Sequence, residues 1–253
     1  MHWIEKFPSP IIFGHRGASQ VAPENTITSF ELALRHGAEA IELDTRLSAD
    51  GIPMVIHDRT VDRTTNGFGK VDQISTHELR KLDAGAKFPS KYSHEKIPLL
   101  EEVFITFKNR ALINVELKNN HNLSDILPEI VIELTNKLNM LDQTLFSSNF
   151  PASLKRIKQL DSHAHVALIC SQGILGYLLR SKLFSSVSPD YIHPNFNDIS
   201  MPFIERQHRM NRKVNIWTAN QKRLLIRLIN LGVDGIITDN PKLAYKLKRE
   251  MRK

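Results

Sequence analysis

Short apolar runs alternate with amphipathic stretches along the whole chain, a pattern typical of strands that alternate with helices. The apolar runs are rich in β-branched side chains and predict strands at Ile11–Gly14, Ala40–Leu47, Ala111–Leu117, Thr144–Ser148, His165–Cys170, Tyr191–Pro194, Lys213–Thr218 and Gly235–Thr238. The stretches between them repeat their apolar residues at helical spacing and predict helices at Asn25–His36, Leu99–Lys108, Ser124–Asn139, Pro151–Gln159, Ile174–Lys182, Ser200–Asn211, Gln221–Asn230 and Pro241–Arg252.

Eight strand–helix pairs predict an α/β fold in which parallel strands are joined by crossover helices. This number favours a closed (β/α)8 TIM barrel over an open doubly wound sheet, and 253 residues suit one such barrel. Prolines at the helix starts Pro151 and Pro241, and glycines after the helical runs at Gly37 and Gly232, support the same division. We therefore expect a single domain spanning residues 1–253.

One segment, roughly Arg59–Pro98, interrupts this rhythm after the second strand. It follows a short companion strand at Ile52–Ile56 and contains a turn cluster at Thr64–Gly69 and a short helical pattern at Thr76–Leu82. The segment shows no core pattern and is too long for an ordinary loop between a strand and a helix. It predicts a small insertion subdomain that caps the mouth of the barrel.

Composition and charge narrow the possible partners. The net charge of +7 comes from 34 basic and 27 acidic residues, and much of the excess lies in Lys242–Lys253. We interpret that run as a solvated terminal helix, because no aromatic or glycine residues accompany the charge as they do in nucleic-acid-binding segments.

Cys170 is the only cysteine, so no internal disulfide can form. Met1–Pro10 does not resemble a signal peptide, and no stretch approaches the roughly 18 apolar residues of a membrane helix. We expect a cytoplasmic protein without stable membrane insertion and without a nucleic-acid partner; the oligomeric state stays open.

Carboxylates gather at the ends of the predicted strands, where a barrel of this kind places its active site. Glu42 and Asp44 lie two residues apart on one strand and therefore point to the same face, and Glu116 comes from the neighbouring strand. Buried carboxylates are costly unless they are paired or bind a cation. Three oxygen ligands without a matching cluster of bases predict a site for a hard divalent ion, Mg²⁺ or Ca²⁺.

Histidines and cations surround the same place. His15 and His57 each follow directly on an apolar strand, and two histidines beside a carboxylate cluster are typical of a general acid and a general base. Arg16 and Lys118 flank the cluster and suit an anionic phosphoryl group. Together these residues predict cleavage of a phosphoric ester. The alternative is a set of buried ion pairs between the carboxylates and these cations, with Arg46 as a further partner.

The motifs also resemble a known family, the glycerophosphodiester phosphodiesterases, from about residue 11 to about residue 245. The stretches that carry the resemblance are Gly14–Ala18, Ala22–Thr26, Ile41–Arg46, Asp50-Gly51, His57-Asp58, Arg63–Gly67, Ile97–Val103, Asn114–Lys118, Val214–Thr218 and Gly235–Asp239. The resemblance implies a TIM barrel with an insertion, and hydrolysis of a small-molecule glycerophosphodiester to an alcohol and glycerol 3-phosphate. By the same resemblance, the general acid and base are His15 and His57, the ligands of a divalent ion are Glu42, Asp44 and Glu116, and the substrate contacts are Arg16, Lys118 and Trp217.

Departures from the family pattern fall in loops that we expect to select the alcohol headgroup. Asn149 separates Ser148 from Phe150, where the family commonly has phenylalanine directly after serine. His193 either joins the pocket or ends a strand, and we favour the second reading; Trp217 lines the glycerol side of the pocket or caps the barrel core. Both direct attack by water and a route through a cyclic phosphate fit the residues.

Other activities remain as alternatives. A larger apolar pocket would make the protein a lysophospholipase D acting on a lysolipid, although the insertion holds few apolar residues. A metabolite-binding barrel without activity would not need a matched acid and base. A nucleic-acid phosphodiesterase would gather its positive charge around the site, which this chain does not do.

Overall fold

Eight parallel strands form a closed barrel in the computed structural model, which describes residues 6–118, 125–173 and 187–252. The strands are β1 (Ile11–His15), β2 (Ala40–Leu47), β4 (Leu112–Leu117), β5 (Thr144–Ser148), β6 (His165–Cys170), β7 (Tyr191–Pro194), β8 (Lys213–Ile216) and β9 (Gly235–Thr238). Each pairs with the next along the chain, apart from the short strand β3, and pairing of β1 with both β2 and β9 closes the ring. The predicted TIM barrel is confirmed.

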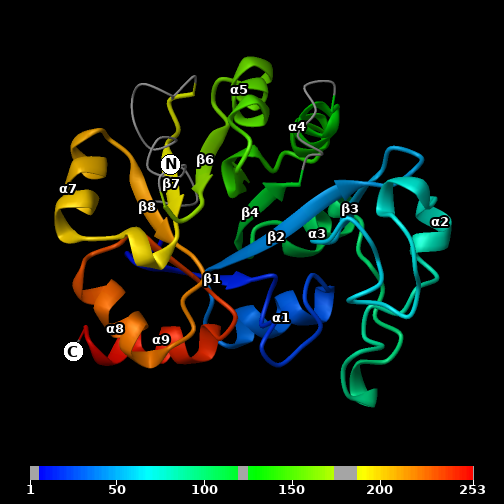
Figure 1. Ribbon diagram of the computed structural model, residues 1–253, viewed down its shortest axis with the longest axis horizontal. Helices are drawn as coiled ribbons and strands as arrows, with labels where there is room; N and C mark the ends of the chain where they lie inside the picture. The colour runs from blue at the N-terminus through cyan, green and yellow to red at the C-terminus, as the bar shows by residue number, and fades with distance from the viewer. Residues whose placement is uncertain (1–5, 119–124, 174–186, 253) are drawn as a thin grey trace.

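Helices surround the ring of strands in Figure 1. They are α1 (Ile27–Arg35), α3 (Leu100–Phe107), α4 (Leu127–Lys137), α5 (Pro151–Leu160), α7 (Met201–Arg209), α8 (Lys222–Asn230) and α9 (Pro241–Glu250). Side chains cap several of them: Thr26, Ser200 and Asn240 each accept a hydrogen bond from a backbone N–H in the first turn. The predicted helix Ile174–Lys182 lies outside the described residues.

The core has two layers, because alternate strand residues point into the barrel or out toward the helices. The interior at the N-terminal end of the strands is filled by apolar side chains, among them Phe13, Leu112, Leu145 and Tyr191. Outward-facing strand residues pack against the helices in two larger clusters. The inward-facing apolar side chains fill the interior at the N-terminal end of the strands. The polar residues at the C-terminal ends of the strands therefore lie above this apolar layer, on the solvent side of the barrel.

The insertion extends to one side of the barrel in Figure 1. It begins after β3 (Pro53–Val55), which pairs antiparallel with β2, and contains η2 (Val71–Gln73), α2 (Thr76–Leu79) and η3 (Ser90–Tyr92). The sequence showed no core pattern here, yet the segment buries a small apolar cluster of its own. That cluster consists of Met54, Ile56, Val61, Val71, Leu79, Ala84 and Ile97. Its members are too widely spaced along the chain to show a helical or strand period.

Candidate active site

Three carboxylates meet at the C-terminal ends of β2 and β4. Glu42 and Asp44 lie on β2, and Glu116 lies on β4, where it is the direct register partner of Asp44. One carboxylate oxygen from each residue lies within 4.8 Å of the other two. Glu42 and Asp44 are buried, and Oδ1 of Asp44 has no hydrogen-bond partner. Pairing of the two strands therefore forces three acidic groups into one small space that could hold a metal ion.

The proximity of these groups changes their affinity for protons. Burial and the neighbouring charge of Asp44 raise the pKa of Glu42 to about 8, and the same two causes raise the pKa of Glu116. Burial would raise the pKa of Asp44 too, but Arg16 and Lys118 outweigh it and hold that pKa well below its usual range. The cluster thus has more carboxylates than its neighbouring cations neutralise.

The two predicted cations both contact the cluster. Nε of Arg16 lies 3.1 Å from Oδ2 of Asp44, and Nζ of Lys118 donates a hydrogen bond of 2.8 Å to Oε1 of Glu116. The ion pairs that the sequence offered as an alternative therefore exist for Arg16 and Lys118. Arg46 instead donates its hydrogen bonds to backbone carbonyls. Because both cations are only partly buried, they can also contact an anionic ligand above the carboxylates.

His15, at the end of β1, is held by a carboxylate from the end of β9. Its Nδ1 lies 2.5 Å from Oδ1 of Asp239, which also accepts a hydrogen bond from the Ser19 hydroxyl; Asn220 donates to the other oxygen of Asp239. Burial lowers the pKa of His15, but the hydrogen bond to Asp239 and the charge of Glu42 outweigh it and raise that pKa above its ordinary value. Nε2 of His15 points toward the cluster, 3.9 Å from Oε2 of Glu42.

His57 has the same type of partner from its own loop. Its Nδ1 lies 2.6 Å from Oδ1 of Asp58, and Nε of Arg63 donates to the other oxygen of Asp58 at 2.6 Å. Arg63 also makes two hydrogen bonds of 2.7 Å to Glu24, which in turn accepts one from Arg16. Burial would raise the pKa of Asp58, but Arg63 and His57 hold it at about 2. A chain of alternating charges therefore connects the insertion to the end of β1.

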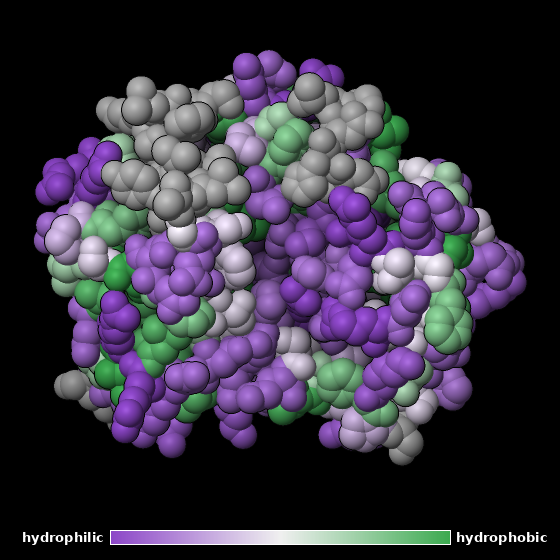
Figure 2. Space-filling view, in the orientation of Figure 1, coloured by the Kyte–Doolittle hydropathy of each residue, from purple (hydrophilic) through white to green (hydrophobic). Residues whose placement is uncertain are grey.

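Both histidines line one cavity of about 240 Å³ together with Glu42 and Glu116. Its walls also include Asn114, Asn149, His193 and Trp217. Figure 2 shows a hydrophilic hollow near the centre of the visible face. His193, for which we favoured the role of ending a strand, lies near the end of β7 and also in this wall. Trp217 combines both of its readings, because it lines the cavity, packs on the apolar interior and donates its Nε1–H to the carbonyl of His193 at 2.7 Å.

Comparison with known proteins identifies the family. A family model described as glycerophosphoryl diester phosphodiesterase matches residues 15–243. The chain belongs to this family. A relative named glycerophosphodiester phosphodiesterase, from Caldanaerobacter subterraneus subsp. tengcongensis, is 37% identical over 244 residues, which cover 95% of this chain and 98% of the relative. The resemblance seen in the motifs is confirmed, and the chain is an enzyme of the glycerophosphoryl diester phosphodiesterase family.

Solved structures of the family share the whole fold. A glycerophosphodiester phosphodiesterase from Agrobacterium tumefaciens superimposes with a TM-score of 0.81 at 28% identity, covering 93% of this chain and 98% of the other. A phosphodiesterase from Oleispira antarctica, solved in complex with the product sn-glycerol-3-phosphate, superimposes with a TM-score of 0.87 at 27% identity and covers both chains completely.

Several residues of this family member support the site without having been assigned roles from the sequence. Asp239 and Asp58 hold the two histidines, and Arg63 holds Asp58. Asn25 donates its side-chain amide to Oδ2 of Asp44 at 2.9 Å, while its backbone takes a φ of +58° that asparagine tolerates better than most residues. All four fall inside the motifs quoted above, so position in a motif was the available signal.

Proposed function

We propose that the protein hydrolyses glycerophosphodiesters to an alcohol and sn-glycerol 3-phosphate, with a divalent metal ion and two histidines as acid and base. The observation that carries this proposal is that two histidines, each held by an aspartate, line one cavity with Glu42 and Glu116 of the carboxylate cluster. The Oleispira antarctica neighbour, which holds sn-glycerol-3-phosphate as its product, supports the same substrate class.

The carboxylate cluster fits a hard divalent cation. Its oxygens spread over no more than 4.8 Å, and two ligands on opposite sides of Ca²⁺ would stand about 4.6–5.2 Å apart. Mg²⁺ would need the ligands slightly closer, because its bonds are about 2.0–2.1 Å long. Oδ1 of Asp44 is buried, accepts no hydrogen bond from any described residue and has Nζ of Lys118 nearby at 3.5 Å, so it can serve as a ligand beside Glu42 and Glu116. A bound ion supplies Lewis-acid polarisation of the phosphoryl oxygen and offsets the negative charge of the cluster.

The histidine–aspartate pairs fix which ring nitrogen of each histidine carries a proton. Asp239 and Asp58 have lowered pKa values, so their ionised carboxylates can only accept, and Nδ1 of each histidine carries the proton. Nε2 is then left to exchange protons in the cavity. One histidine takes the proton of the attacking hydroxyl, and the other donates a proton to the alcohol oxygen as its bond to phosphorus breaks.

The remaining side chains orient the substrate. Arg16 and Lys118 offset the charge of the phosphate as the attacking oxygen adds, an effect that is strong in a partly buried site. Trp217 offers an apolar ring surface in the same cavity, which suits the carbon chain of the glycerol. In this proposal the carboxylates bind the ion, the histidines move protons, and these three residues hold the substrate.

The direct test is release of glycerol 3-phosphate from glycerophosphocholine, glycerophosphoethanolamine and glycerophosphoglycerol, with Mg²⁺, with Ca²⁺ and with EDTA. We expect release that EDTA abolishes. His15→Ala and His57→Ala should each lower the rate by at least about 100-fold. His77→Ala is the matched control, since that side chain is 77% exposed on the insertion. Turnover that survives in the double variant His15→Ala/His57→Ala would exclude the assigned chemistry.

A further inference from the structure

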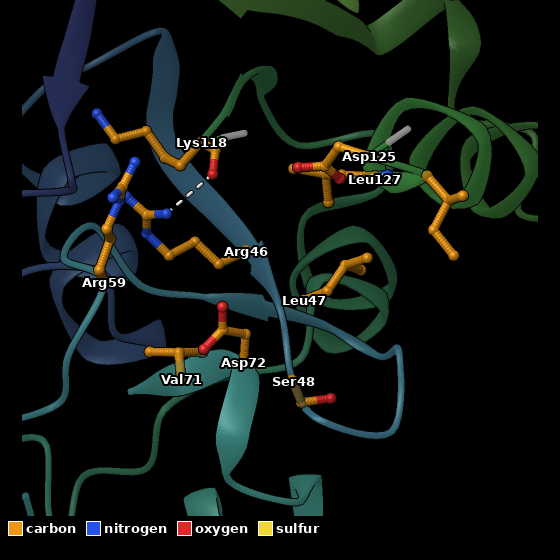
Figure 3. Close-up of a pocket in the computed structure, with 10 residues that line it drawn as sticks. Arg46, Leu47, Ser48, Arg59, Val71, Asp72, Lys118, Asp125 and Leu127 are labelled. Atoms are coloured by element: carbon orange, nitrogen blue, oxygen red, sulfur yellow. Dashed lines mark hydrogen bonds between the residues drawn. The ribbon is translucent and has the colours of Figure 1, made fainter. Parts of the chain in front are cut away.

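A second cavity, of about 280 Å³, opens beside the proposed active site. It is lined by Arg46, Leu47, Ser48, Arg59, Val71, Asp72, Lys118, Asp125, Ile126 and Leu127, most of which Figure 3 labels. Lys118 belongs to the walls of both cavities, so the two are neighbours across one residue. None of the roles proposed above uses the other residues of this second cavity, which we call the rim cavity.

Arg46 lines the rim cavity and also contacts residues of the proposed active site. It lies two residues beyond Asp44 on the same strand, so it shares the face of the carboxylates and lies one step nearer the mouth of the barrel. Its Nε donates to the carbonyl of His57 at 2.8 Å and its Nη1 to the carbonyl of Lys118 at 2.9 Å. A group bound to Arg46 from the rim cavity would therefore lie next to His57 and Lys118.

The rim cavity contains two arginines that make no close ion pair with any described residue. Within the described part of the chain, neither Arg46 nor Arg59 forms an ion pair within 4.0 Å of a carboxylate. Figure 3 draws the ends of these two side chains near one another. Two neighbouring guanidinium groups without a close ion-pair partner form a binding site for a carboxylate or a phosphate.

The opposite charge lies elsewhere on the same cavity. Asp72 is exposed and makes no ion pair with any described residue, and Figure 3 draws its carboxylate below the carbon chain of Arg46 and away from the end of Arg59. Asp125, across the view, accepts the backbone N–H of Leu127. A purely cationic headgroup would leave the two guanidinium groups unpaired, and a polyphosphate would approach two carboxylates. A group that carries one carboxylate and one ammonium ion matches both the two guanidinium groups and the acidic side of the cavity.

We propose that the rim cavity binds the leaving headgroup of the substrate and selects an amino-acid headgroup, with its carboxylate on Arg46 and Arg59 and its ammonium ion toward Asp72. This assignment rests on the proposed function. It places the departing alcohol on the side of the site formed by His57 and Lys118, since those residues adjoin Arg46. A serine ester of glycerol phosphate has the required headgroup.

Two substrates that differ only in the carboxylate test the proposal: glycerophosphoserine and glycerophosphoethanolamine. We expect the wild-type kcat/KM to be roughly tenfold or more higher for the serine ester, the gain typical of a charge-assisted hydrogen bond. Arg59→Gln should bring the ratio of the two values close to 1. Arg223→Gln, which removes the same charge from an exposed position on α8, should leave the ratio at its wild-type value.

A ratio near 1 in the wild type, or one that Arg59→Gln does not change, would overturn the subsite while the turnover itself upholds the proposed function. Activation or inhibition by inorganic phosphate that depends on Arg59, with no preference between the esters, would show a site for free anions and would also overturn it. If neither ester is hydrolysed, the proposed function fails, and calorimetry still tests the cavity. Phosphoserine should then bind at least about tenfold more tightly than phosphoethanolamine to the wild type and not to Arg59→Gln; equal binding would exclude the assignment.

Discussion

His193 should make the protein less stable in mildly acidic solution. The side chain is 1% exposed inside the barrel, and its Nε2 accepts a hydrogen bond of 3.0 Å from the amide of Asn215. Burial lowers the pKa of His193 to about 3, because no anionic partner compensates for the loss of water around the charged form. The folded protein therefore keeps this imidazole neutral at pH values well above 3.

Protonation of His193 then favours the unfolded chain, in which an exposed histidine has a pKa of about 6.5. Between the two pKa values the unfolded state binds more protons, so the free energy of unfolding falls as the pH falls. At pH 5 the contribution is a loss of about 2 kcal/mol, from 1.36 kcal/mol for each of about 1.5 pH units, and at pH 7 it is about 0.2 kcal/mol. Because pH 5 lies well above the folded pKa, nearly all of the effect comes from the unfolded chain.

Urea unfolding of EDTA-treated protein at pH 7 and pH 5 measures this effect. His193→Gln loses the titrating group, so the stability difference between wild type and variant should shift by about 2 kcal/mol in favour of the variant between pH 7 and pH 5. His77→Gln, at a largely exposed position, should shift the difference by far less. A difference that is the same at both pH values would show that His193 takes up a proton in the folded state, and the reasoning from burial would be wrong.

Three further changes test other parts of the structure. Asp239→Asn should lower kcat by a factor of roughly 10²–10⁴ and leave KM nearly unchanged. The reason is that the change disturbs the protonation and orientation of His15 without removing a substrate contact. A drop in kcat of less than threefold would refute that role. Lys248→Met should cost about 1.5–3 kcal/mol in denaturant unfolding, because partly buried Glu39 loses its cation and keeps, among the described residues, only the backbone N–H of Ile12. Adding Glu39→Gln should recover part of the loss, and additive costs would argue against a coupled pair. Ca²⁺ at about 100 times its dissociation constant should stabilise the wild type by about 2.7 kcal/mol in thermal unfolding and Asp44→Asn much less, whereas equal stabilisation would place the ion elsewhere.

The barrel strands were the part of the fold that the sequence predicted best. Ala40–Leu47 and Thr144–Ser148 match β2 and β5 to the residue, since strands buried on both faces read as continuous apolar runs. Lys213–Thr218 extends two residues past β8, because Trp217 pairs with the chain after β7 instead of continuing the ladder with β9. Apolar character alone does not report where a strand loses its neighbour. The Asn25–His36 helix begins two residues late, because Asn25 adopts a positive φ and Thr26 caps the first turn.

The sequence revealed the carboxylates and histidines of the site better than it revealed the residues that hold the histidines in place. The carboxylates on β2 and the histidine at the end of β1 were visible because buried charge at the end of an apolar strand is unusual. The partners that hold the histidines were not, since their roles depend on contacts between distant segments. His15 and Asp239 are 224 residues apart and meet only because β1 and β9 pair when the barrel closes. The alternative reading made Arg46 an ion-pair partner of the carboxylates, but its donors are directed to two backbone carbonyls.

The same strand pairing explains why the carboxylate cluster could hold a cation. The register of β2 and β4 fixes Asp44 opposite Glu116, and alternation along β2 fixes Glu42 on the same face, so the backbone gives these charges no room to separate. Asn25, Arg16 and Lys118 all direct hydrogen-bond donors or positive charge at Asp44. Asp44 is therefore stabilised as an anion, while Glu42 and Glu116 bear the repulsion. A divalent ion shared by all three would relieve the repulsion where the protein's own cations do not, which is the physical reason to expect the ion at this place in the barrel.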